Sequence, residues 1–229
     1  MKPRLAPKRQ MKFGLILALL FLCVASIFGQ SNSATFAPDR VSLYKVPLVC
    51  PAAPQIGCGS RAKPILLAFE HQPVVESAWL NHAGTLLAVV WKANSKSKER
   101  STVVKSVSKG QGLDAVELKG EERKEPLGDF LGGSWLRGSD VDRLSAEEAG
   151  ILAGRLLRKI RGVVPVTEER AKILRDQFAE TLKRRLTGEL TDRDSTQEEI
   201  VKALRQQLSE QEVTHLQEIL KDYRPGQDQ

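Results

Sequence analysis

The apolar run Phe13–Gly29 constrains this chain more than any other feature of its sequence. It follows the basic segment 1–12, and small and polar residues come directly after it. That order is typical of a secretory signal, with cleavage after Gly29 or Ser33. A retained membrane anchor is the alternative, since about 17 apolar residues are the short limit for a spanning helix. Residues 1–33 therefore predict export to the periplasm or cell envelope, either as a cleaved signal peptide or as an inner-membrane anchor formed by residues 13–29.

Most of the net charge of +7 belongs to this leader. Five basic residues and no acidic residue stand before position 34, and subtracting these five leaves +2 for the remainder. The five are Lys2, Arg4, Lys8, Arg9 and Lys12. So small a balance gives no general attraction to phosphate backbones or anionic lipids. We therefore expect no nucleic-acid partner, and membrane contact only through an uncleaved N-terminal segment.

Residues 41–119 predict a small α+β domain. Alternating or continuous apolar runs predict strands at 41–49, 74–80, 85–91 and 113–118. Helices are expected from a Ser60 cap to about residue 72, with Pro64 in the first turn, and over 96–109. The turn residues 81–84 join the second and third strands as a hairpin. The β-α-β-β-α-β order predicts a ferredoxin-like sandwich, a four-stranded antiparallel sheet with two helices on one face.

The rest of the chain predicts a linker followed by helices. Residues 120–140 are charged and then glycine-rich, and we expect Phe130, Leu131 and Trp135 of this linker to dock on a neighbour. Residues 141–224 carry apolar stripes at helical spacing and predict a small α-helical bundle. Its four helix starts are expected at Ser145 with Glu148, Thr167 with Glu168 and Glu169, Ser195 with Glu198, and Ser209 with Glu212. These helices are the expected surface for a protein partner or for self-association.

The first domain resembles the heavy-metal-associated domain family of ferredoxin-like modules. The strongest stretch is Val75-Glu76-Ser77-Ala78-Trp79-Leu80-Asn81-His82-Ala83-Gly84-Thr85, followed by Val89 and Val90. The resemblance covers about residues 41–119 and implies a soft-metal site of the copper or mercury type in the loop after the first strand. There it places Cys50 and Cys58, with an ion such as Cu(I) as the expected cofactor. The family separates its two thiols by two residues, whereas this chain separates them by seven.

The residues themselves leave three roles open for Cys50 and Cys58. Two thiolates from a segment rich in Pro and Gly can hold a soft metal ion. Outside the cytoplasm the same pair can close a structural disulfide, which stabilises a small loop by roughly 2–3 kcal/mol. A cycling thiol–disulfide oxidoreductase is the third alternative.

No enzyme motif is recognisable, and His71, His82 and His215 share no ligand spacing. The sequence therefore predicts a non-catalytic, metal-binding envelope protein with a helical interaction module. A structural or protein-interaction protein with a Cys50–Cys58 disulfide is the alternative.

Overall fold

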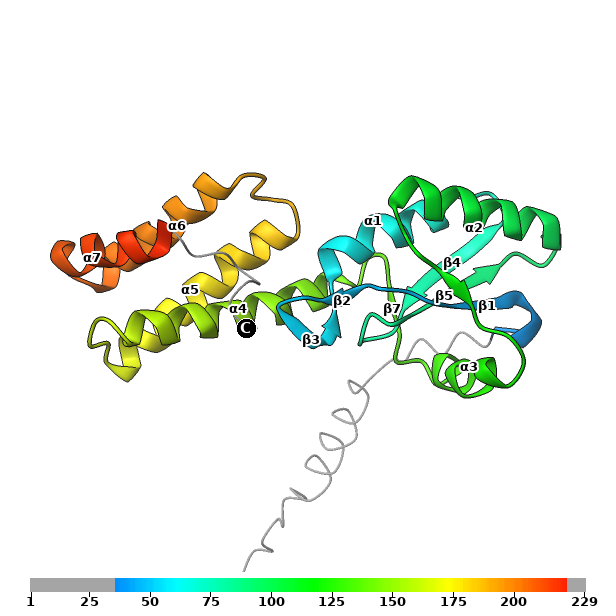
Figure 1. Cartoon of the computed structure of the whole chain (residues 1–229), viewed down its shortest axis with the longest axis horizontal. Coiled ribbons are helices and arrows are strands. Elements are labelled where there is room, and N and C mark those ends of the chain that lie inside the picture. The colour runs from blue at the N-terminus through cyan, green and yellow to red at the C-terminus, as the bar shows by residue number, and fades with distance from the viewer. Residues whose placement is uncertain (1–35, 222–229) are drawn as a thin grey trace, which may run out of the picture. The chain divides into compact units, whose positions relative to one another are not determined.

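The computed structural model describes residues 36–221, with side chains as far as residue 217. The leader, including the predicted signal or anchor, lies outside the described residues. The fold is α+β: a mixed region with a five-stranded antiparallel sheet, and then four helices that pack together (Figure 1). In the described part of the chain, no helix combines the length and apolarity needed to cross a membrane.

The sheet has the strand order β6-β1-β5-β4-β7, and each neighbouring pair is antiparallel. Its strands are β1 (Val41–Lys45), β4 (Val75–Leu80), β5 (Leu86–Trp91), β6 (Val116–Glu117) and β7 (Leu136–Arg137). Two helices of this region are α1 (Gly59–Glu70) and α2 (Ser97–Gln111). The predicted hairpin at 74–91 is confirmed to within a residue at each end. The predicted strand 41–49 is too long, because the backbone leaves β1 after Lys45.

Residues 50–60, predicted as a loop, instead contain a second, two-stranded sheet. It consists of β2 (Val49–Cys50) and β3 (Ala53–Gly57). The helix after it begins at Gly59 rather than after Ser60, and Pro64 lies in its interior beyond the first turn. Proline removes one helical hydrogen bond at that point, and its exposed position leaves the ring in solvent.

Both faces of the five-stranded sheet are covered, which the prediction of two helices on one face missed. Side chains alternate between faces along a strand. Leu87, Val89 and Trp91 belong to the large core that includes α1 and Val107 of α2. Ala88 and Val90 belong to a smaller cluster with Phe130 and Trp135. Figure 1 accordingly shows α2 on one side of the sheet and α3 (Lys124–Leu131) on the other.

Residues 120–140, expected as a linker, form this second cover. They contain a 3-10 turn, η2 (Gly120–Arg123), then α3 and the edge strand β7. Phe130 stacks on Phe36 with ring centroids 5.8 Å apart, and its edge-to-face contacts reach Trp79 and Trp135. The Trp135 indole donates to Asp129 at 2.7 Å. The expected docking of Phe130, Leu131 and Trp135 is thus present, with the sheet itself as the neighbour.

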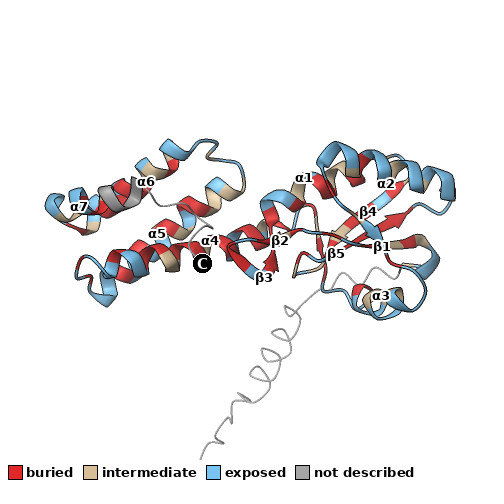
Figure 2. Cartoon of the chain, viewed as in Figure 1, coloured by how far each residue is buried: buried red, intermediate tan, exposed pale blue. Residues whose placement is uncertain are grey.

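The C-terminal helices are α4 (Asp142–Arg161), α5 (Glu168–Leu186), α6 (Arg193–Gln207) and α7 (Glu210–Lys221). Their inner faces are buried, as Figure 2 shows, and they share the large core with the sheet region. Thr167 caps α5, and Ser209 and Glu212 form the predicted reciprocal cap of α7. Asp192, rather than Ser195, caps α6 by accepting the Ser195 N–H at 2.7 Å.

The turn between β4 and β5 holds the β2–β3 hairpin in place. The Asn81 side-chain carbonyl accepts the N–H groups of Thr85 and Leu86, both at 2.9 Å. Gly84 has φ +72°, and its carbonyl accepts the Leu48 N–H at 3.0 Å. A side chain at Gly84 would overlap the Leu48 carbonyl oxygen. Only glycine therefore satisfies both the conformation and the close approach.

Gly84→Ala should lower the free energy of unfolding by about 2 kcal/mol or more, because a left-handed backbone and a backbone overlap act together. Gly110→Ala in α2 is the matched control, since nothing lies within 4 Å of its added methyl group. The control should stabilise the protein by about 0.5–1 kcal/mol. Urea unfolding of the two variants would measure both effects, and equal midpoints would contradict the assigned role of Gly84.

Candidate functional site

Cys50 and Cys58 lie on the same hairpin but are not joined. In the register of β2 and β3, Cys50 is opposite Ala53 and Val49 is opposite Gly57. The Cys58 N–H donates to the Leu48 carbonyl at 2.7 Å. The register shifts between Val49 and Cys50, so the two cysteines are not paired across the hairpin. Both are free thiols, beyond disulfide distance, so the disulfide expected as an alternative is not formed in this structure.

Both thiols are buried. Cys50 is 0% exposed and Cys58 is 5% exposed. Cys58 is the residue directly before α1, and its Sγ lies 3.4 Å from the Ser60 hydroxyl. No described residues form a group of three or more His, Cys, Asp or Glu side chains that could hold a metal ion.

Cys50 faces a carboxyl group that the metal hypothesis did not include. Its thiol lies beside Glu148 of α4, and each group acts on the pKa of the other. Burial, reinforced by the charge of Glu148, raises the pKa of Cys50 from 9.0 to about 11. Burial also raises the pKa of Glu148, which the Cys50 thiol partly opposes. The site is therefore a buried thiol–carboxyl pair between the hairpin and α4.

Sequence reasoning placed Ser145 and Glu148 at the start of a helix, and this is wrong. Helix α4 begins at Asp142, and Ser145 and Glu148 are buried within it. Val141 and Leu144 are fully buried, so tertiary packing extends the helix one turn earlier than the capping pattern indicates. The overlooked signal was spacing, since Leu144, Glu148 and Leu152 recur at the four-residue interval of one helical face.

These surroundings do not favour thiolate chemistry at Cys50. Soft-metal binding and thiol exchange both require the thiolate form. A pKa of about 11 keeps Cys50 protonated at neutral pH. An ion would have to displace that proton inside a packed contact. The metal role of Cys50 and Cys58 remains a prediction.

The three histidines are exposed. His82 Nε2 lies 2.9 Å from Glu147, on the solvent side of α4. His71 directly follows α1, and His215 lies on α7. The three histidines thus lie on separate elements at the surface and, as their spacing predicts, form no shared ligand set.

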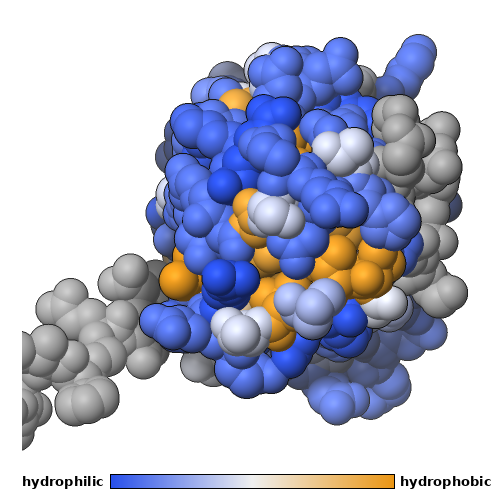
Figure 3. Space-filling model, turned by 90° about the vertical axis from the view of Figure 1, so that its left-hand side faces the viewer, coloured by the Kyte–Doolittle hydropathy of each residue, from blue (hydrophilic) through white to orange (hydrophobic). Residues whose placement is uncertain are grey.

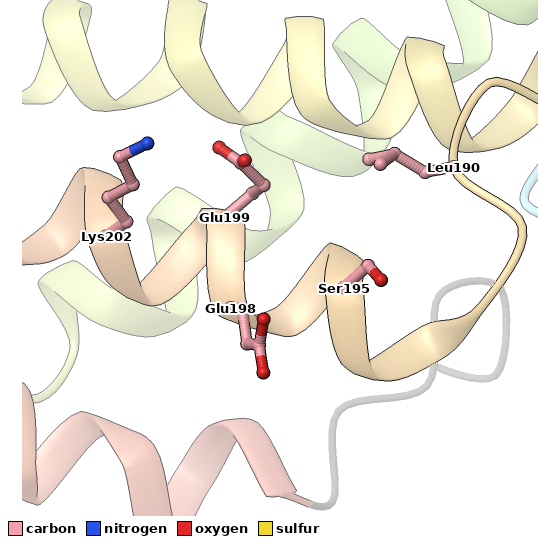
Figure 4. A pocket seen from close by; sticks show the side chains of 5 residues that line it. All are labelled: Leu190, Ser195, Glu198, Glu199 and Lys202. Carbon is pink, nitrogen blue, oxygen red and sulfur yellow. The ribbon is translucent and has the colours of Figure 1, made fainter.

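An open pocket lies beside α6, far along the chain from the cysteines. Figure 4 shows Glu199 and Lys202 pointing toward α5, while Glu198 points the other way. Leu190 and Ser195 complete the lining. Its charged side chains are those of an ordinary solvated helix surface, and no cysteine or histidine is among them.

No protein-family model, curated protein or solved structure matches this chain.

Cys50 in the native protein at pH 7.5 should react with iodoacetamide at least tenfold more slowly than in the urea-unfolded chain, because the thiol is both buried and protonated. Peptide-resolved mass spectrometry would measure each cysteine separately. As pH rises from about 9 to 11, the unfolded thiol ionises before the folded one. Native stability should fall over that range, and Cys50→Ala should remove this part of the fall. Rapid native labelling of Cys50 would contradict the assignment.

Proposed function

We propose that the chain is a non-catalytic, exported envelope protein whose α+β core carries a helical module for self-association. The observation that carries this proposal is the exposed apolar surface of the helical module. The leader 1–33 supports export, because its basic, apolar and small-residue order is that of a secretory segment.

The α+β core is best described as a ferredoxin-like sandwich with additions. Taken alone, β1, α1, β4, β5, α2 and β6 follow the β-α-β-β-α-β order. Their strands lie in the order β6-β1-β5-β4, in which the first and third strands of the motif are central. The β2–β3 hairpin and the edge strand β7 are the additions. This topology supports the resemblance to heavy-metal-associated domains in fold, whereas the buried thiols do not support it in metal chemistry.

Helix α4 connects the core to the helical module. Near its start, Lys63 of α1 pairs with Asp142 at 2.6 Å. Farther along, Leu152, Leu156 and Ile160 are buried in the core shared with α5 and α6. One unbroken helix thus carries the module, so the module is presented by a packed element rather than by a flexible tether.

The helical module exposes large hydrophobic side chains. Three such side chains are exposed among the described residues, and two of them, Val163 at 39% and Ile173 at 38%, belong to α5 and the turn before it. Figure 3 shows apolar surface gathered in one area on the side of the molecule where these helices lie. An apolar area on the surface of a helical module is a candidate interaction site.

A second copy of the chain is the occupant that this surface fits best. Residues 142–221 contain as many acidic as basic residues, so two copies of the module have no net charge repulsion to overcome. An apolar patch is also complementary to itself across a two-fold axis, the commonest symmetry of soluble oligomers.

The double variant Val163→Lys, Ile173→Lys should shift the full chain from dimer to monomer in sedimentation velocity, because four lysines would be buried in the interface. Val116→Lys is the matched control, since Val116 is the third exposed hydrophobic residue and lies on β6. It should leave the dimer unchanged. A wild-type chain that stays monomeric at about 100 μM would overturn self-association, since a specific homodimer forms well below that concentration.

A further inference from the structure

Glu148 occupies an unusual position for a carboxyl group. Its side chain lies at the contact of α4 with the β2–β3 hairpin, and the residue is 7% exposed. Cys50 reaches it from β2, yet Oε2 has no hydrogen-bond partner. The Ser145 hydroxyl, one turn earlier, is also buried without a partner. A buried carboxylate with so few donors is costly, whereas a neutral acid is tolerated.

Helices α1 and α4 are packed closely together one turn before Glu148. A methyl group added at Gly59 would overlap both the Ser145 hydroxyl and the Val141 carbonyl oxygen. The first turn of α1 therefore lies directly against α4, with no space for a side chain between them. Separation of the hairpin from α4 would expose the buried Oε2 of Glu148 to water.

The charged groups of the neighbouring elements are engaged elsewhere. On α1, Lys63 pairs with Asp142, and Arg61 donates to the Pro47 carbonyl at 3.3 Å. Glu147 of α4 pairs with His82. On α5, Lys183 pairs with Glu180 and Arg184 with Glu189. Cys58 contacts Ser60.

On the same face of α4, Arg155 lies two turns along from Glu148 and has a buried Nη1 without an acceptor, and Lys159 lies a turn farther on and is exposed. Strand β3 contributes no ionisable group. Among the described residues, the ionisable side chain that acts on the pKa of Glu148 is the Cys50 thiol, which is neutral at pH 7.

We propose that Glu148 is a pH-sensitive latch: as a neutral acid it holds the β2–β3 hairpin on α4 most strongly, and its ionisation weakens that contact without displacing the closed state. In the closed contact burial raises the pKa of Glu148, whereas in the open state the carboxyl group is hydrated and has its ordinary pKa of 4.5. The open state therefore loses its proton first as pH rises. The closed contact is at full strength below the ordinary pKa and weakens as pH rises through the raised one.

Backbone hydrogen exchange of the full chain between pH 4 and 8, corrected for the intrinsic rate, tests the latch. The reporting amides are Gly57, which donates to the His82 carbonyl, and Cys58, which donates to the Leu48 carbonyl. In the wild type their protection should fall by up to about tenfold per pH unit, the slope of one proton. In Glu148→Gln it should stay flat, since the amide is neutral at every pH. Amides of α6 should show no such slope in either protein.

Glu147→Gln is the matched control, because Glu147 is the adjacent residue but is exposed and pairs with His82 on the surface. It should keep the wild-type slope. The latch is overturned if Glu148→Gln retains the slope, if Glu147→Gln abolishes it, or if α6 loses protection in parallel with the hairpin. Should Glu148→Gln fail to fold, the carbon-13 titration of the Glu148 carboxyl in the wild type decides: its midpoint must lie above 4.5 and coincide with the loss of hairpin protection.

Discussion

The close approach of α1 to α4 is the contact on which the rest of the arrangement depends. Gly59 has no side chain, so the first turn of α1 lies directly on the backbone of α4 at Val141 and Ser145. This contact joins the sheet region to the helices through one continuous apolar core. It also encloses Cys50 and Glu148, because the β2–β3 hairpin that precedes α1 is carried onto the same helix. Burial of two ionisable groups is the consequence of that packing.

Two unfavourable arrangements lie on either side of this contact, one buried and polar and the other exposed and hydrophobic. At the junction of core and helices, polar side chains are enclosed and poorly satisfied: Ser145 and Glu148 both retain a buried oxygen without a partner. Farther along the helical module, hydrophobic side chains such as Val163 and Ile173 are exposed. Both arrangements cost free energy in an isolated chain. Self-association would cover the exposed hydrophobic side chains. Opening of the junction would instead give the buried oxygens of Ser145 and Glu148 access to water.

Several elements were predictable because their signals are local. The hairpin at 74–91 follows from apolar runs around turn residues, and Asn81 and Gly84 occupy the turn as that chemistry requires. Thr167 and Ser209 were found as helix caps because a cap needs only residues within one turn. The prediction of a linker over residues 120–140 is wrong, because their apolar side chains pack against the second face of the sheet and that face is not visible in the local sequence.

The candidate site likewise combines features that follow from the local sequence with features that depend on tertiary packing. Local patterns are enough to place Cys50 and Cys58 between a strand and a helix and to assign the α+β class, because strand and helix periodicities are properties of neighbouring residues. The contact of Cys50 with Glu148, a residue 98 positions away along the chain, arises only when the hairpin packs on α4. A capping pattern and a core stripe can use the same residues. Which of them applies to Ser145 and Glu148 depends on what packs against α4, and no local signal contains that information.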